Sequence, residues 1–299
     1  MKKITIPAFP GNKNRLQLKH KDTLIGMLFF LPWIVGFLLF TLYPIIFSIR
    51  LSFNEYQQLP GGAVMDWAGF RYFNQAWNTD LHFKLNLSNS LLFVSCATPV
   101  VMVFALIIAI LLNTKFRLRT FFRVLFFMPV LIMSGPVISR LLSKYTTDFS
   151  ANTPQIYQFI NNLPEVVSKP VLLILNNLVL MLWFSGVQIL IFIAGLQKIG
   201  PDLYAAAEID GAGAWEKFWK ITLPFMKPLI LVTTAYTVMT LSNYTNNAVN
   251  RQIRSSMFLT SNLYSLAAAM SWIYFVAIIL LLAIIYLVLF LFGRRRQRA

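Results

Sequence analysis

Several stretches of this chain run for about 20 residues or more without a charged side chain, long enough to cross a hydrocarbon layer roughly 30 Å thick. A long helix in a soluble protein carries one apolar stripe and one charged stripe, but these stretches are apolar on all sides. Only 12% of the residues are charged, about half of the usual fraction in soluble domains. The sequence therefore predicts an all-α, polytopic membrane protein.

Six membrane spans are predicted within a transmembrane domain of residues 24–293. They lie at about 24–49, 86–112, 121–142, 171–196, 228–249 and 271–293. Residues 1–23 are predicted to form an N-terminal tail, and residues 294–299 a basic C-terminal tail. The first span follows basic residues, as the apolar part of a signal peptide does, but it exceeds the roughly 7–15 residues of such a segment. We therefore expect it to be a retained helix.

The basic residues indicate the orientation of these spans. Of the 26 lysines and arginines, 18 lie in the two tails and in the connections after the second and fourth spans. The other connections carry the remaining 8. Because the side richer in lysine and arginine is usually cytoplasmic, both termini are predicted to face the cytoplasm. The net charge of +16 is then a feature of the membrane topology, and nucleic-acid binding is disfavoured.

The predicted spans contain no aspartate or glutamate. Ion-driven carriers usually need an ionisable group inside the membrane, so an ion-coupled secondary carrier is the weaker alternative. A membrane enzyme is disfavoured because acid–base chemistry needs a titratable group at the reacting atom. Cys96, His20 and His82 are too dispersed to form a metal site. Because the chain has no phosphate-binding G-x-x-x-x-G-K-[ST] loop, energy from ATP would have to come from another subunit.

The predicted cytoplasmic loop of residues 197–227 has its own helical pattern. Pro201 suits the first turn of a short helix, and Gly211 and Gly213 would separate it from a second helix over about 214–221. Its small and aromatic residues suit a knob that enters a groove of a partner protein. An interfacial helix packed on the bundle fits the same pattern, and the residues alone leave both interpretations open.

This loop resembles the EAA loop of ABC-importer permeases, which docks into the ATPase subunit. The matching motifs are Ala206-Ala207, Asp210-Gly211-Ala212 and Ile221-Thr222-Leu223-Pro224. Gly195-Leu196-Gln197, Pro201-Asp202-Leu203-Tyr204, Phe30-Leu31-Pro32-Trp33, Phe40-Thr41-Leu42-Tyr43-Pro44 and Arg119-Thr120-Phe121-Phe122-Arg123 resemble the carbohydrate branch, the maltose and glycerol-phosphate permease-like group.

The resemblance implies a type I ABC importer permease fold and a multi-pass subunit of the bacterial cytoplasmic membrane. Such a subunit forms half of the pathway for a sugar or oligosaccharide and is not itself an enzyme. The implied partners are a second permease, usually a different chain, two ATPase subunits, and an extracellular or periplasmic binding protein. This chain would bind no cofactor, since ATP and Mg would be bound by the ATPase subunits.

The resemblance also implies which residues couple to the ATPase. They are Leu203, Tyr204, Ala205, Ala206, Ala207, Glu208, Asp210, Gly211, Ala212, Gly213 and Phe218. The chain departs from the family pattern at Ala205, where the family has a glutamate. Glu208 lies about one helical turn further along. This departure puts one polar contact with the ATPase in doubt.

A polar stripe in the fifth span suggests a substrate pathway. Thr233, Tyr236, Thr240, Asn243 and Asn247 follow a spacing of three and four residues, which would place them on one helix face towards the bundle interior. In the fourth span, Ser185 and Gln188 are three residues apart. Hydroxyl and amide groups can bind sugar hydroxyls, but they can equally join helices by hydrogen bonds. The pathway candidates are Ser185, Gln188, Tyr236, Thr240, Asn243 and Tyr244.

Overall fold

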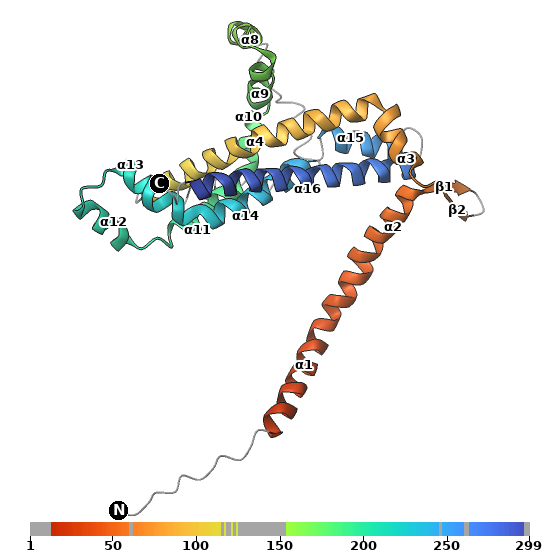
Figure 1. Cartoon of the computed structure of the whole chain (residues 1–299), viewed down its shortest axis with the longest axis horizontal. Coiled ribbons are helices and arrows are strands. Elements are labelled where there is room, and N and C mark those ends of the chain that lie inside the picture. Colours follow the sequence, from red (N-terminus) through yellow and green to blue (C-terminus); the bar gives the residue numbers. More distant parts are fainter. Residues whose placement is uncertain are drawn as a thin grey trace, which may run out of the picture.

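The computed structural model describes residues 13–59, 62–114, 117, 121, 124, 154–244, 247–259 and 263–295. Apart from residues 121 and 124, the expected third span at 121–142 lies outside the described residues, as do residues 1–12 and 296–299 of the two expected tails. The described part is almost entirely helical (Figure 1). The predicted all-α class is confirmed.

In the described part of the chain, four helical stretches are long and apolar enough to cross a membrane. They are Ile25–Phe53, Leu81–Asn113, Ala214–Ser242 and Tyr264–Leu291. The first comprises most of α1 (Lys13–Phe37) with η1 (Leu38–Leu42) and α2 (Tyr43–Phe53), the second is α4 (Leu81–Asn113), and the last belongs to α16 (Tyr264–Arg295). Within the described residues, α11 (Gly186–Leu196) and α12 (Pro201–Ile209) would give a fifth span if this pair, bent by 66°, crossed as one.

Shorter elements connect these helices. After α2 come β1 (Asn54–Leu59), β2 (Gly62–Trp67), α3 (Arg71–Asn74) and η2 (Gln75–Thr79). The described chain resumes with α8 (Pro154–Asn161), α9 (Glu165–Asn176) and α10 (Leu178–Phe184), which lead into α11. α12 is followed by α13 (Ala214–Lys217), η3 (Phe218–Thr222) and α14 (Leu223–Ser242), and then by α15 (Ala248–Arg254) and η4 (Ser255–Leu259).

β1 and β2 form an antiparallel hairpin in which Asn54 pairs with Trp67 and Leu59 with Gly62. The sequence analysis did not predict this hairpin. The alternation of β-forming residues is weak here, and the Pro-Gly-Gly segment at 60–62 is the main signal for a turn.

Two of the π turns end two residues before a proline. η1 precedes Pro44, and η3 precedes Pro224. A proline ring inside an α-helix clashes with the carbonyl group four residues earlier. The π turn relieves this clash, and the amides of Tyr43 and Leu223 bond to carbonyls five residues earlier. The helices therefore continue through these prolines.

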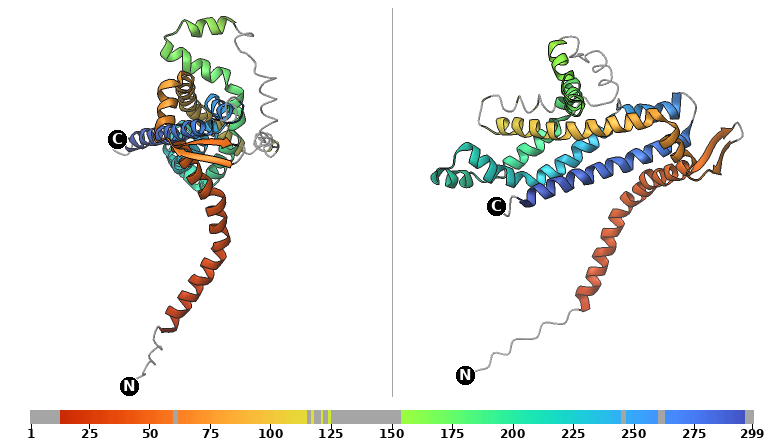
Figure 2. Two further views of the ribbon diagram at one scale, coloured as in Figure 1. Left: turned by 90° about the vertical axis from the view of Figure 1, so that its right-hand side faces the viewer. Right: turned by 45° about the horizontal axis from the view of Figure 1, so that its top comes forward.

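α4, α11, α14 and α16 pack together as a bundle, and α12 and α13 lie at one end of it beside the end of α16 (Figures 1 and 2). The hairpin and α3 lie at the opposite end. α8 and α9 project from one side of the bundle, while α1 leaves on the other. None of the described side chains from Ile25 to Arg50 is buried. A helix that is apolar all round and unburied needs lipid or another protein beside it.

The helices of the expected fourth and fifth spans differ from the sequence-based boundaries. The expected span 171–196 contains breaks at Asn177 and Ser185, whose side chains bond to the carbonyls of Leu173 and Leu182. The expected span 228–249 corresponds to a continuous helix of Ala214–Ser242. The chain then breaks before α15. The breaks in the fourth span follow from side chains that bond to nearby carbonyls. The fifth span begins earlier than expected because prolines are tolerated within membrane helices.

Candidate functional site

The cytoplasmic loop predicted from the sequence forms an elbow, which we define as residues 201–222. α12 begins with Pro201 after the extended Gly200, and Asp202 lies in its first turn. Gly211 has a φ of +78°, a conformation that favours glycine, and reverses the chain between α12 and α13. The sequence predicted a second short helix that ends near residue 221. In the structure, the helix that begins at Ala214 instead continues through η3 and Pro224 into α14.

Most of the predicted coupling residues lie on the surface of this elbow. Leu203, Ala205, Ala206, Glu208, Asp210, Gly211 and Gly213 are exposed, whereas Tyr204, Ala207, Ala212 and Phe218 are half-buried. Ala205, Ala206 and Ile209 share the outer face of α12. Ile209 is 87% exposed and Trp215 72% exposed, although the sequence analysis selected neither. The spacing of four residues between Ala205 and Ile209 could have indicated that Ile209 lies on the same face of α12.

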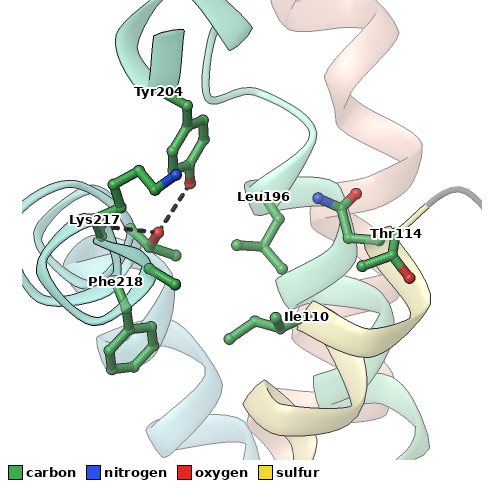
Figure 3. A pocket seen from close by; sticks show the side chains of 9 residues that line it. Ile110, Thr114, Leu196, Tyr204, Lys217 and Phe218 are labelled. Carbon is green, nitrogen blue, oxygen red and sulfur yellow. Dashed lines mark hydrogen bonds between the residues drawn. The ribbon is translucent and has the colours of Figure 1, made fainter. Parts of the chain in front are cut away.

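The inner side of α12 is fastened to the following helix. The hydroxyl groups of Tyr204 and Thr222 are 2.9 Å apart, and Lys217 Nζ lies 2.7 Å from Glu208 Oε1. The hydrogen bond and charge of Lys217 lower the pKa of Glu208 below its usual value. Figure 3 shows Tyr204 and Lys217 around a cavity of about 290 Å³, whose far wall contains Ile110 of α4 and Thr114, the residue that follows this helix.

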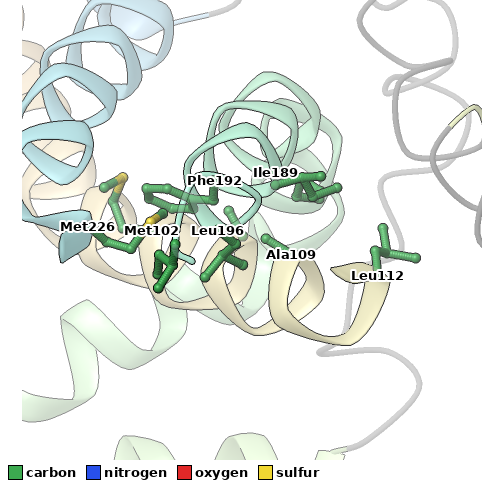
Figure 4. Packing of buried hydrophobic residues seen from close by; sticks show 10 residues of the cluster. Met102, Ala109, Leu112, Ile189, Phe192, Leu196 and Met226 are labelled. Carbon is green, nitrogen blue, oxygen red and sulfur yellow. The ribbon is translucent and has the colours of Figure 1, made fainter. Parts of the chain in front are cut away.

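Close helix packing anchors the bundle beneath the elbow. Ile189, Phe192 and Leu196 of α11 pack with Met102 of α4 and Met226 of α14 (Figure 4). A Cβ atom at Gly195 would lie 2.1 Å from Leu229 Cδ1 and 2.9 Å from Met226 Sδ. The absence of a side chain at position 195 therefore permits the close approach of α11 and α14.

The candidate pathway residues fall into two groups. Ser185 and Gln188 are completely buried. The Gln188 side chain donates to Thr237 Oγ1 at 3.0 Å and so joins α11 to α14, which is the helix-joining alternative noted in the sequence. Tyr236 is 36% exposed, and Asn243 is also exposed.

Tyr236, Thr240 and Asn243 follow one another at the end of α14. Thr240 is half-buried and donates to the carbonyl of Tyr236 at 2.8 Å. The spacing of four and three residues keeps this polar strip on one side of the helix. Tyr244 follows the helix and packs edge-to-face on Phe184. The strip therefore has both hydrogen-bonding groups and an aromatic ring on an accessible face.

Asn247 does not continue this strip, because α14 ends at Ser242. Its side chain is buried and accepts hydrogen bonds from the Ser90 hydroxyl at 2.7 Å and the Val249 amide at 3.0 Å. It also donates to Tyr274 Oη at 3.1 Å. Tyr274 in turn donates to the carbonyl of Ser242 at 3.0 Å. This buried network joins residues distant in sequence, which is why the helical spacing of Asn247 was misleading.

Comparison with known proteins identifies the family. No protein-family model matches the chain. The chain is 30% identical to a probable ABC transporter permease protein, YesP of Bacillus subtilis (strain 168), over 212 residues that cover 71% of this chain and 68% of the relative. The chain belongs to the ABC transporter permease family. This permease is also 29% identical to the lactose transport system permease protein LacF of Rhizobium radiobacter, over 74% of both chains.

The permease also has the fold of a known transporter subunit. It matches a chain of a crystal structure of a bacterial ABC transporter involved in the import of the acidic polysaccharide alginate. The TM-score is 0.64 at 20% identity, and the match covers 94% of this chain and 99% of the other. The long apolar helices and the family together establish a multi-pass membrane protein. Its relatives are transport subunits rather than enzymes.

Proposed function

We propose that this permease forms half of the membrane pathway of an ATP-driven importer for a sugar or oligosaccharide. The elbow is the observation that supports this proposal best. Its outer face carries exposed apolar side chains, among them Leu203 and Ile209, at the end of a bundle with the fold of an importer subunit. Exposed apolar side chains outside a membrane-spanning helix favour contact with a protein partner.

In this proposal, the elbow docks into a cytoplasmic ATPase subunit through the exposed face of α12. Ala205 and Ala206 permit a close approach, and Leu203 and Ile209 supply apolar contact. Ala205 removes the glutamate of the family motif from this face. In the same proposal, the elbow and both chain termini face the cytoplasm, in agreement with the distribution of lysine and arginine. ATP and Mg are bound by the ATPase subunits.

A second permease completes the pathway. The helical segment from Ile25 to Arg50 offers it a large apolar surface, since none of the described side chains of this segment is buried. In this branch of the family, the second permease is usually a different chain. A binding protein outside the membrane delivers the sugar at the opposite end from the elbow. In this proposal, the two permeases lie in the bacterial cytoplasmic membrane, the ATPase subunits on its inner side and the binding protein on its outer side.

The polar strip on α14 is the proposed sugar-contacting surface of this chain. Tyr236 and Asn243 are accessible from the side of α14, and Thr240 lies between them. Hydroxyl and amide groups bind sugar hydroxyls, and aromatic faces pack on the C–H surfaces of sugar rings. Ser185 and Gln188 are not exposed, so they lie within the bundle rather than on this surface. Gln188 holds α14 through its hydrogen bond to Thr237. The relatives that transport lactose and other carbohydrates support a sugar as substrate.

The proposal is tested by isolating the tagged permease from its native membrane in mild detergent and identifying the accompanying proteins by mass spectrometry. We expect an ATPase subunit and a second permease. Ala206→Arg places a long charged side chain on the exposed face of α12 and should remove the ATPase while the second permease remains.

Gln158→Arg, an exposed change on α8, is the matched control and should leave both partners in place. If the native chain is recovered without an ATPase even after crosslinking, the proposed coupling is wrong. Uptake driven by an ion gradient would then favour the carrier alternative.

A further inference from the structure

The long helix from Ala214 to Ser242 has a weak point near the elbow. Its π turn, η3, spans Phe218–Thr222. Pro224 follows and has no amide hydrogen to donate, so the backbone ladder loses a bond close to this turn. Helices bend most readily where a π bulge or a proline interrupts the ladder. A force on α13 would therefore bend the helix at the π turn unless another element held it.

α12 contacts this helix on both sides of the π turn. Tyr204 reaches Thr222, the last residue of the turn, and Glu208 reaches Lys217, the residue immediately before it. Tyr204 and Glu208 are four residues apart and lie on the same face of α12. Their partners are five residues apart and enclose the turn. α12 therefore bridges the turn with two side chains.

Thr222 makes a second contact across the turn, because its hydroxyl also lies 3.4 Å from the carbonyl oxygen of Lys217. The Thr222 and Tyr204 hydroxyl groups are 2.9 Å apart, and either of them can donate the hydrogen bond. Thr222 is buried and Tyr204 half-buried, so this bond is partly shielded from water.

α12 is not fastened to α4 in the same way. Among the described residues, the side chains of α12 make hydrogen bonds outside their own helix only to Lys217 and Thr222. The cavity of about 290 Å³ lies between the elbow and the end of α4, with Ile110 and Thr114 on its far side (Figure 3). The elbow therefore has room to move against α4 but is held against the helix of Ala214–Ser242.

We infer that α12 acts as a splint across the π turn, with Tyr204 and Glu208 as the positioning residues that transmit movement of the elbow into α14. The inference rests on the proposed function, since the movement is the one that an attached ATPase would impose. The helix of Ala214–Ser242 is about 43 Å long and carries Tyr236 and Thr240 near its far end. The splint would therefore connect ATPase movement with the proposed sugar-contacting strip.

The splint also gives Glu208 a role. The family motif has its glutamate at the position of Ala205, on the exposed face of α12. Glu208 lies about one turn further along and bonds to Lys217 within the elbow. In this chain, Glu208 therefore joins α12 to the following helix within the elbow.

The test measures distances between spin labels in the assembled transporter, with Cys96 replaced by alanine. One pair of labels joins Pro201 to Lys227, across the splint, and another joins Pro201 to Thr114 at the end of α4. Pro201 is exposed at the start of α12 and is not one of the proposed docking residues. Adding ATP, Mg and orthovanadate should change the distance from Pro201 to Thr114 by roughly 1–5 Å, the size of known helix shifts. The distance from Pro201 to Lys227 should stay constant.

Removing the splint should reverse this result. In a Tyr204→Phe and Glu208→Gln double variant, the distance from Pro201 to Lys227 should change on adding ATP, Mg and orthovanadate. The charge-swapped pair Glu208→Lys with Lys217→Glu should restore a constant distance when Tyr204 is intact. Tyr286→Phe is the matched control. It also removes a tyrosine hydrogen bond to α14, the bond of 2.9 Å from Tyr286 to the carbonyl of Leu231, but Tyr286 lies outside the elbow. It should leave both distances as in the native chain.

The inference is overturned if the distance from Pro201 to Lys227 changes in the native transporter, or if it stays constant in the double variant. It is also overturned if neither distance responds in a native transporter that retains its ATPase. Failure of the proposed function gives a different result, since no ATPase would then accompany the labelled chain.

Discussion

The two ends of the helix from Ala214 to Ser242 are held in opposite ways. At the elbow, two contacts near the surface join α12 to Lys217 and Thr222. At the far end, Asn247, Ser90 and Tyr274 form a buried network beside the helix terminus. Buried polar networks are costly to disturb, whereas exposed pairs contribute little to stability. The far end is therefore built as a fixed point, and the elbow as a part that can move.

Asn247→Ala should give the largest loss of stability among the changes that test this comparison. It leaves the Ser90 hydroxyl and the Val249 amide without their acceptor, and it removes the N-cap of α15. We expect a loss of roughly 2–3 kcal/mol in the free energy of unfolding, measured by thermal denaturation in detergent. Asn243→Ala, an exposed change at the same break, should cost less than about 0.5 kcal/mol. Equal losses for the two variants would contradict the fixed far end.

Gly195→Val tests whether the helix is also firmly packed just beyond the elbow. The new side chain would displace Leu229 and Met226 and should lower the free energy of unfolding by about 1–2 kcal/mol. Gly200→Val is the matched control, because a Cβ atom there meets nothing within 4 Å. A loss no greater than that of the control would mean that α14 moves freely against α11.

Glu208→Gln should have the smallest effect. The ion pair with Lys217 is exposed, so the unfolding temperature should not change measurably. The pKa of Glu208 is lowered in the folded protein, so the ion pair contributes its full stabilisation above the ordinary glutamate pKa of about 4.3. This stabilisation is lost only as the pH falls through the lower pKa that Glu208 has in the folded protein. The distance between labels at Pro201 and Lys227 should therefore be constant from about pH 8 to pH 6.

A distance that changed within that range would show that a group other than Glu208 controls the elbow. The Glu208→Gln variant separates the two cases, since it has no carboxyl group to titrate at this position.

Much of this protein could be predicted from local sequence features. Charge-free stretches predicted the long membrane helices, and Pro201 with Gly211 marked the two ends of α12. The family and the all-α class also followed from local motifs. The polar spacing in the fifth span was less informative. Tyr236 and Asn243 are accessible, but Asn247 lies beyond a break and belongs to a buried network.

Local sequence patterns specify which segments are apolar enough to enter a membrane and where the elbow lies, because both depend on residues close together along the chain. The end of α14 depends on long-range contacts, since Ser90, Asn247 and Tyr274 come together from three separate segments. Long-range folding also brings Glu208 to Lys217 and Tyr204 to Thr222. Such contacts depend on how helices fold back on one another, and no local spacing specifies them.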